Sequence, residues 1–238
     1  MQLILLSAGR GSRLSSKLRR KPKSLAKVND KTIIDHNLAF FNKFKKKYII
    51  TGFKKNLLNN FAKKNNFKMI HNKKFQSTNM VYSMFLASKF INQDVVICYG
   101  DIIFNSNVYN LLNKKGNIIP LNINWLKIWK KRMLTKNIKN DAENISIKNN
   151  YLSSIGGKIG KKYPKYQYMG IFKLSNKTYS DLNKFFKVIK NSKIDMTSFL
   201  NTSIINKKIK LKVKKYKSYW YEIDNKKDLD VSSRELVK

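Results

Sequence analysis

A short apolar run followed at once by a glycine-rich turn is the feature that most limits what this chain can fold into. Residues 3–6 (LILL) carry no charge, and Gly9 and Gly11 follow one residue apart. An uninterrupted run of this length is typical of a strand buried on both faces, as in a parallel sheet. The glycines leave backbone amides bare, so an anion can approach them closely. The pattern predicts a buried first strand that ends in an anion-binding loop, although a plain glycine turn remains an alternative.

The next 60 residues alternate between helical and extended patterns. Apolar residues at helical spacing over residues 32–45 and 55–66 predict two helices. Residues 47–51 (KYIIT) and 67–70 (FKMI) predict strands between and after them. A strand–helix–strand–helix–strand order implies right-handed crossovers, an α/β fold and ligands at the carboxyl edge of a mostly parallel sheet.

Two acidic side chains follow predicted strands later in the chain. Asp101 comes after the apolar run of residues 95–98 and after Gly100, and Asp224 ends the string WYEID. A carboxylate just beyond a buried strand is well placed to hold Mg²⁺, which takes one or two carboxylates together with phosphate oxygens and water. The alternative for Asp101 is the cap of a helix that begins near Asn105.

A longer signature extends the glycine turn. Residues 8–14 (AGRGSRL) and 21–25 (KPKSL) resemble the nucleotidyltransferases that join a nucleoside triphosphate to a phosphorylated small molecule and release pyrophosphate. Their pattern is AGxGxRL followed by a lysine in a PK element. The GSRL and KPKSL forms are more similar to the branch that acts on phosphocholine and related amino-alcohol phosphates or phosphonates than to the sugar-nucleotide branch.

The resemblance implies both a fold and a set of nucleotide contacts. The expected fold is α/β, a single Rossmann-like (GT-A-like) domain over residues 1–238, with a mixed, mostly parallel central sheet flanked by helices. Residues 1–115, approximately, would hold the nucleotide and residues 116–238 the acceptor. Arg13 and Lys23 are expected to be catalytic, and Asp101 and Asp224 to bind Mg²⁺. The expected nucleotide contacts are Leu6, Ala8, Gly9, Arg10, Gly11, Ser12, Thr78, Asn79, Ser83 and Gly100.

The base is expected at the segment TNMVYS, residues 78–83. Its polar side chains supply the donors and acceptors needed to read a pyrimidine edge, and its likeness to the phosphocholine-type branch favours CTP. The alternative is a plain helix cap at Thr78 or Asn79, and both interpretations can hold together.

Aromatic and acidic residues in the second half are candidates for an acceptor site. Trp125 and Trp129 share one helical face, which suits either the core or a pocket for an alkylammonium group. Asp141 and Glu143 would point to one face of an extended chain, either toward a cation or as a solvated pair. Asp195 is a natural helix cap as well as an acceptor candidate. The expected acceptor contacts are Trp125, Trp129, Asp141, Glu143, Tyr168, Asp195 and Glu222.

The net charge of +38 suggests a nucleic-acid-binding protein as an alternative from another class. However, the abundant Lys is accompanied by Asn, Ile, Phe and Tyr, with only 9 Gly and 3 Pro. A bias toward AT-rich codons explains all of these shifts together, and the lysines are spread over every segment. We therefore expect no specific nucleic-acid partner.

The resemblance leads to one functional expectation. The chain would transfer CMP from CTP to phosphocholine, 2-aminoethylphosphonate or a similar acceptor, with a sugar-1-phosphate nucleotidylyltransferase as the alternative. The single cysteine, Cys98, and the lack of an apolar run near the ~20 residues of a membrane span favour a cytoplasmic location. Because Leu3 already belongs to the first predicted strand, we expect no N-terminal signal.

Overall fold

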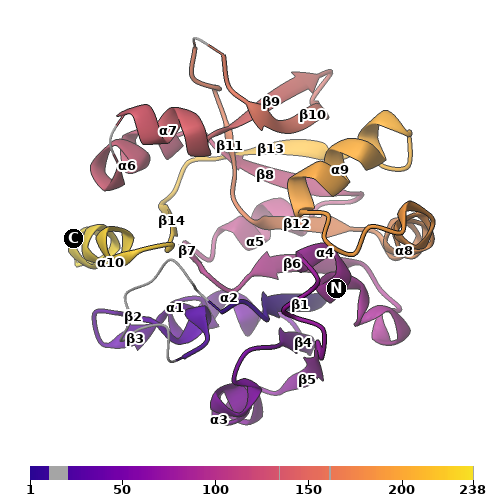
Figure 1. Cartoon of the computed structure of the whole chain (residues 1–238), viewed down its shortest axis with the longest axis horizontal. Coiled ribbons are helices and arrows are strands. Elements are labelled where there is room, and N and C mark those ends of the chain that lie inside the picture. The colour runs from indigo at the N-terminus through magenta and orange to yellow at the C-terminus, as the bar shows by residue number, and fades with distance from the viewer. Residues whose placement is uncertain (11–20, 134, 161, 238) are drawn as a thin grey trace.

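A mixed ten-stranded sheet forms the centre of the molecule (Figure 1). The computed structural model describes residues 1–10, 21–133, 135–160 and 162–237. Within them the strands follow the order β5-β4-β1-β6-β12-β8-β13-β10-β9, and β11 also pairs with β8. Their bounds are β1 Gln2–Ser7, β4 Lys46–Thr51, β5 Phe67–His71, β6 Val95–Tyr99, β8 Ile118–Asn122, β9 Glu143–Lys148, β10 Tyr151–Lys158, β11 Gln167–Tyr168, β12 Ile171–Leu174 and β13 Lys212–Tyr216.

The first half of the sheet confirms the predicted parallel arrangement. β1 lies between β4 and β6 and pairs in parallel with both, and β5 extends the sheet beyond β4. All six residues of β1 are buried, as expected for a central strand. The carboxyl ends of β1, β4, β5 and β6 therefore meet along one edge of the sheet.

The second half continues the sheet with three reversed strands, β10, β11 and β12. β12 runs antiparallel to both β6 and β8, so that β6 and β8 point the same way, and β13 pairs with β8 in parallel. β9 and β10 form a hairpin, in which Asn149 and Asn150 adopt φ angles of 51° and 63°. Most strands thus share one direction, as the resemblance implied.

Helices cover both faces of the sheet. The apolar side chains of β1 alternate between these faces, so each face has a core cluster that helices bury. Leu3 and Leu5 belong to one core cluster, and Ile4 and Leu6 belong to the other. The first cluster packs under α1, α2, α3, α5, α6 and α7, and the second under α4, α8 and α9. The bounds are α1 Ile33–His36, α2 Leu38–Phe41, α3 Asn59–Lys64, α4 Met80–Phe85, α5 Val108–Leu112, α6 Trp125–Arg132, α7 Thr135–Asp141, α8 Asn176–Ile189 and α9 Met196–Ile205.

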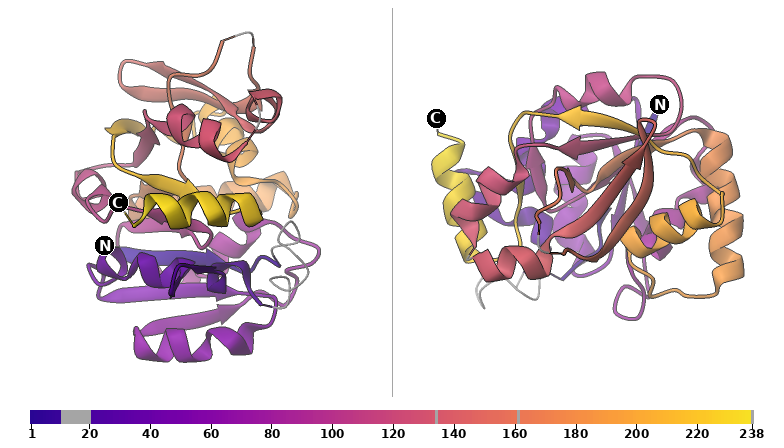
Figure 2. Two further views of the ribbon diagram at one scale, coloured as in Figure 1. Left: turned by 90° about the vertical axis from the view of Figure 1, so that its left-hand side faces the viewer. Right: turned by 90° about the horizontal axis from the view of Figure 1, so that it is seen from above.

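The last helix, α10 (Lys226–Glu235), lies between the two halves of the molecule (Figure 2, left). It packs against β2 (Lys27–Val28), which pairs with β3 (Lys31–Thr32), and also against α6. The strand before it, β14 (Trp220–Glu222), pairs with β7 (Ile102–Phe104) just beyond Asp101. This pairing brings the end of the chain back to the end of β6. No helix among the described residues is both long and apolar enough to cross a membrane.

The expected helix over residues 32–45 breaks at Asn37, whose side chain donates to the Ile102 carbonyl at 2.7 Å and accepts from the Phe104 amide. Gly170, with a φ of 74°, separates β11 from β12. A Cβ atom there would lie 2.7 Å from the Tyr99 ring, so glycine permits this close approach.

Candidate functional site

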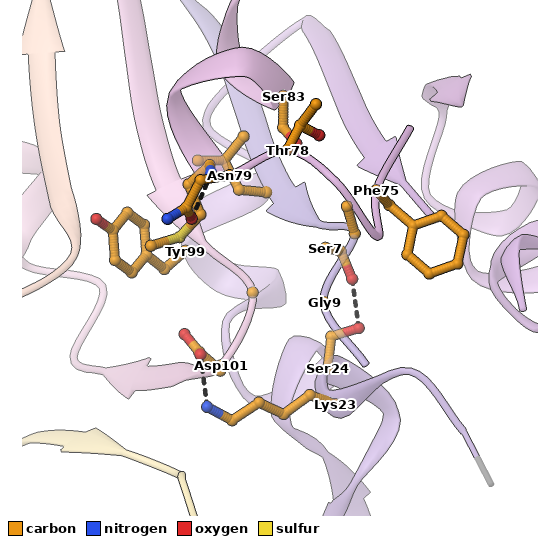
Figure 3. Close-up of a pocket in the computed structure, with 14 residues that line it drawn as sticks. Ser7, Gly9, Lys23, Ser24, Phe75, Thr78, Asn79, Ser83, Tyr99 and Asp101 are labelled. Carbon is orange, nitrogen blue, oxygen red and sulfur yellow. Dashed lines mark hydrogen bonds and ion pairs between the residues drawn. The ribbon is translucent and has the colours of Figure 1, made fainter. Parts of the chain in front are cut away.

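The first hollow of the site lies at the carboxyl ends of β1 and β6 (Figure 3). Its floor is formed by the end of β1 and the turn after it, and Thr78, Asn79 and Ser83 line its far side at the start of α4. Gly100 faces the hollow where a Cβ atom would lie 2.8 Å from the Leu6 carbonyl oxygen. The hollow is lined by Leu6, Ser7, Ala8, Gly9, Lys23, Ser24, Phe75, Thr78, Asn79, Met80, Ser83, Tyr99, Gly100 and Asp101.

Lys23 joins the two acids that were predicted to hold a metal. Its ammonium donates to Asp101 Oδ2 at 2.7 Å and also bonds to Asp224 Oδ1. Burial alone would lower the pKa of Lys23, but the carboxylates of Asp101 and Asp224 outweigh it and raise that pKa. Lys23 therefore carries a positive charge between two carboxylates from distant parts of the chain.

These residues fit a divalent cation. The buried Asp101 Oδ1 has no hydrogen-bond partner among the residues described, and hard oxygen atoms are the ligands that Mg²⁺ prefers. In the described part of the chain, no three His, Cys, Asp or Glu side chains are arranged to hold a metal. Two carboxylates still suffice for Mg²⁺, because substrate phosphates and water complete its coordination.

A second hollow adjoins the first. It shares Met80 and Tyr99 with the first hollow, and Trp129 and Trp220 also line it. Five acids line it, namely Asp141, Glu143, Asp195, Glu222 and Asp224. Such a concentration stands out in a chain with only 13 Asp and Glu residues against 51 Lys and Arg. The arrangement suits a ligand that carries a positive group.

Comparison with known proteins identifies the family. The description "MobA-like NTP transferase domain" matches residues 3–116. The chain is also 31% identical to the CTP:phosphoglutamine cytidylyltransferase of Campylobacter jejuni, over 97% of this chain and 98% of that protein. The chain belongs to the nucleotidyltransferase family.

Further similarity links this nucleotidyltransferase to other cytidylyltransferases. It is 28% identical to the choline-phosphate cytidylyltransferase of Streptococcus pneumoniae, over 48% of this chain and about half (51%) of that protein. The solved structure of the CTP:phosphocholine cytidylyltransferase from that organism superposes with a TM-score of 0.79, covering 100% of this chain and 99% of the other at 19% identity. The structural likeness supports the GT-A-like fold.

Not every residue of the predicted phosphate loop can be placed. Gly11, Ser12 and Arg13 lie outside the described residues. Arg10 is exposed, and its guanidinium carbon lies 5.3 Å from the centre of the Phe53 ring. Among the loop residues described, Ala8 and Gly9 line the first hollow and Arg10 does not appear in its lining.

The two tryptophans of α6 have different surroundings, which separates the two interpretations left open by the sequence. Trp125 is 1% exposed, packs edge-on against Trp129, and donates from Nε1 to the Pro164 carbonyl at 3.1 Å. Trp129 lines the second hollow, and its ring lies 6.2 Å from that of Trp220. Both rings are buried, but only Trp129 lines the second hollow, so Trp125 is a core residue that does not reach it.

The paired acids Asp141 and Glu143 reach the same hollow by a different route from the one predicted. Asp141 ends α7 instead of lying on an extended chain, and Glu143 begins β9. Burial raises the pKa of Glu143 to about 7; a hydrogen bond from Thr197 opposes this shift, while Asp195 and Asp141 add to it. Glu143 therefore titrates near neutral pH.

Asp195 combines the two roles considered for it. It caps α9, accepting from the Ser198 amide at 2.8 Å, and it also lines the second hollow. Burial would raise the pKa of its carboxyl, but hydrogen bonds from Ser198 and Thr197 lower it below the usual value. Asp195 is thus the more readily ionised acid on this wall.

Arg132, which the sequence did not indicate as a site residue, pairs with three acids at and after the end of β14. This buried side chain forms a two-pronged pair with Asp228, from Nε to Oδ1 at 2.7 Å and from Nη2 to Oδ2 at 3.2 Å. Its guanidinium also lies 3.6 Å from Glu222 and 3.8 Å from Asp224. Asp228 in turn accepts from the Asp224 amide at 2.8 Å, so that one buried pair fixes the end of β14. One arginine among 51 basic residues gave no signal of its own.

Arg132 also contacts one of the aromatic rings that line the second hollow. The Arg132 guanidinium carbon lies 5.1 Å from the centre of the Trp129 ring, so a resident cation already covers that ring. Burial and the neighbouring Asp224 raise the pKa of Glu222, and Arg132 opposes them. The second hollow is therefore lined by five carboxylates, and a cation already covers one of its two tryptophan rings.

Proposed function

We propose that this chain is a cytidylyltransferase, which transfers CMP from CTP to a small phosphorylated or phosphonylated amino compound and releases pyrophosphate. The observation that carries the proposal is a pair of adjacent hollows that share Met80 and Tyr99, with Lys23 of the first bonded to Asp224 of the second. One is lined by the glycine turn, and the other is lined by five carboxylates. The cytidylyltransferases among its relatives support the choice of CTP.

The proposed division of labour follows the chain. Every residue that lines the first hollow comes before residue 102, whereas most of those that line the second come after residue 128. We therefore propose that residues 1–115, approximately, hold the nucleotide and that residues 116–238 hold the acceptor. In this arrangement the reacting phosphates would meet at the boundary, beside Lys23, Asp101 and Asp224.

The reaction needs no general base. An oxygen of the acceptor phosphate or phosphonate is already ionised at neutral pH, and it forms a bond to the α-phosphorus while the bond to the departing pyrophosphate breaks. Lys23 would neutralise the charge that develops on the α-phosphoryl group, and the backbone amides near Ala8 and Gly9 would hold the terminal phosphates. Bound by Asp101 and Asp224, Mg²⁺ would supply further positive charge to the phosphate oxygens. Catalysis is then positioning combined with electrostatics.

In this mechanism Lys23 stabilises the transition state more than it stabilises bound CTP. We expect Lys23→Ala to lower kcat far more than nucleotide affinity, because the charge that it balances grows as the bond breaks. A loss of affinity with an unchanged kcat would make Lys23 a binding residue only.

We further propose an acceptor whose positive group can donate hydrogen bonds. Glu143 and Asp195 offer acceptor oxygens on one wall, while the Trp129 ring is already covered by Arg132. A primary ammonium, as in 2-aminoethylphosphonate or phosphoethanolamine, meets such oxygens better than the quaternary ammonium of phosphocholine does. Phosphoglutamine, the substrate named for the Campylobacter relative, is a further candidate.

Pyrophosphate release tests the proposal directly. The purified chain would be given Mg²⁺ and CTP with 2-aminoethylphosphonate, phosphoethanolamine, phosphocholine, phosphoglutamine or glucose 1-phosphate in separate reactions. We expect release with an amino compound and none with the sugar phosphate. Release with glucose 1-phosphate alone would assign the chain to sugar-nucleotide synthesis. If no pyrophosphate is released with any acceptor, with either CTP or UTP, the proposal would be overturned.

A further inference from the structure

A buried asparagine behind the first hollow fixes the orientation of two hydroxyl groups. Asn72 is 1% exposed and follows the last residue of β5. Its Oδ1 accepts from the Lys74 amide at 2.9 Å. Because a backbone N–H can only donate, the atom that faces it must be the oxygen, and the amide nitrogen must point the other way. That nitrogen donates to Thr78 Oγ1 and to Ser83 Oγ, each at 3.0 Å.

Thr78 can then only accept a hydrogen bond from a ligand. Its hydroxyl donates to the Lys74 carbonyl oxygen at 2.8 Å, and one of its lone pairs receives the Asn72 amide. A carbonyl oxygen can only accept, so the single proton of Thr78 is committed to it. Since Thr78 lines the first hollow, what remains for a ligand is a lone pair.

Ser83 has the opposite property. Its oxygen also receives the Asn72 amide, but its proton makes no hydrogen bond within the described part of the chain. Ser83 lies beside Thr78 on the same wall of the hollow (Figure 3). The wall therefore presents a fixed acceptor next to an uncommitted donor.

We propose that Asn72 is a positioning residue for base selection, which makes Thr78 an acceptor and Ser83 a donor and so selects cytosine over uracil. This inference rests on the proposed binding of a pyrimidine nucleotide in the first hollow. Cytosine carries an amino donor at position 4, next to the acceptor N3. Uracil carries a carbonyl acceptor at position 4, next to a donor N3–H.

The two bases fit this wall differently. The amino group of cytosine can donate to Thr78, while Ser83 donates to N3 or to O2. If uracil takes the same position as cytosine, its O4 atom faces the lone pair of Thr78, which has no proton to give. Leaving a buried polar group unpaired costs about 1–3 kcal/mol, which corresponds to a preference of about 5- to 150-fold.

Direct binding of CTP and UTP, measured by calorimetry with Mg²⁺ and no acceptor, tests the inference. We expect the wild-type chain to bind CTP about 5- to 150-fold more tightly than UTP. Thr78→Val, which keeps the shape without the oxygen, should largely remove this preference, and Thr78→Ser should retain it. Asn72→Asp should also reduce the preference. The new carboxylate would accept the Ser83 proton, so the hydroxyl of Ser83 could no longer donate to the base.

Ser77→Ala is the matched control, since the Ser77 hydroxyl also bonds to the Lys74 carbonyl but does not line the hollow. A purely structural role for Asn72 would weaken both nucleotides alike and leave their ratio unchanged. Equal binding of CTP and UTP by the wild type, or an unchanged ratio in Thr78→Val, would overturn the inference and leave nucleotidyl transfer intact. Binding of neither nucleotide would overturn the proposed function and this inference together.

Discussion

The ammonium of Lys23 lies 2.7 Å from the carboxylate of Asp101, although 78 residues separate the two in sequence. The same ammonium bonds to Asp224, which follows Lys23 by 201 residues in the sequence. One lysine thus bridges the end of β6 and the segment after β14. The predictions below follow from this bridge and from the acids and aromatic rings beside it.

Replacing Asp101 by Asn should abolish most of the turnover without unfolding the chain. The substitution keeps the shape of the side chain but removes the charge that would hold Mg²⁺, and Lys23 keeps Asp224 as a partner. We expect kcat to fall by at least about 100-fold with an unchanged urea midpoint. Asp230→Asn, the same change on the exposed side of α10, should retain full activity. Wild-type turnover in Asp101→Asn would refute the metal assignment.

Lys23→Met should strengthen the binding of a divalent cation in the absence of nucleotide. In the structure the lysine charge occupies both carboxylates, so a cation must displace it or share them. Removing that charge should raise the affinity for Mn²⁺ by roughly tenfold, equal to about 1.4 kcal/mol. Electron paramagnetic resonance of free Mn²⁺ measures this directly. Unchanged or weaker Mn²⁺ binding would show that the cation binds elsewhere.

Arg132→Met should destabilise the fold strongly. It would leave the buried Asp228 without a cationic partner among the described residues, whereas Asp224 would keep Lys23. Breaking a buried ion pair by removing one partner costs about 3–5 kcal/mol, measurable by urea unfolding. Arg132→Lys should lose less, since it keeps the charge but not the two-pronged geometry. A loss below about 1 kcal/mol in Arg132→Met would contradict this account.

Glu143 should make acceptor binding depend on pH. Burial raises its pKa to about 7, so the carboxyl is largely protonated at pH 6 and ionised at pH 8. An ionised Glu143 adds a negative charge to the second hollow, and the KM for an amino acceptor should therefore fall as the pH rises. Glu143→Gln removes this component and leaves only the titration of the acceptor phosphate. Identical pH profiles for the two proteins would argue against contact with the acceptor.

The same shift has a consequence for stability. The pKa of Glu143 is higher in the folded chain than its usual 4.5, so folding favours the protonated form. The associated stabilisation is complete below about pH 4.5 and is lost as the pH rises through about 7. Glu143→Gln should therefore melt at a higher temperature than the wild type at pH 8. The opposite order at pH 8 would contradict the raised pKa.

Trp125→Phe and Trp129→Phe should affect different properties. Trp125 is in the core and its loss leaves the Pro164 carbonyl without a donor, so stability should fall by roughly 1–3 kcal/mol with the acceptor KM unchanged. Trp129 lines the second hollow, and its Nε1 lacks a partner among the described residues, so its replacement should raise the acceptor KM. An altered acceptor KM in Trp125→Phe would place that ring at the site.

Local patterns in the sequence predicted the first strand and the turn after it. The apolar run at Leu3–Leu6 is the central strand, and Gly9 follows it at the hollow, because strand propensity and tight turns are favoured by the local sequence. The caps Asn79 and Asp195 were predicted for the same reason, since each cap bonds to an amide within three residues. The family resemblance added the expectation that Asp101 and Asp224 converge, which spacing in the sequence does not reveal.

Only the tertiary structure decided how the second half assembles. Arg132 pairs with Asp228, 96 residues away, and such a pair leaves no periodic trace in a chain with 51 basic residues. The two α6 tryptophans look equivalent in sequence and both are buried, yet Trp125 bonds to the Pro164 carbonyl whereas Trp129 lines the second hollow. Asp141 and Glu143 reach the second hollow from the end of a helix and the start of a strand. The sequence by itself thus determined the strand, the turn and the caps, whose interactions are local, whereas the charge of the hollow and the roles of its rings depend on contacts that exist only after the chain has folded.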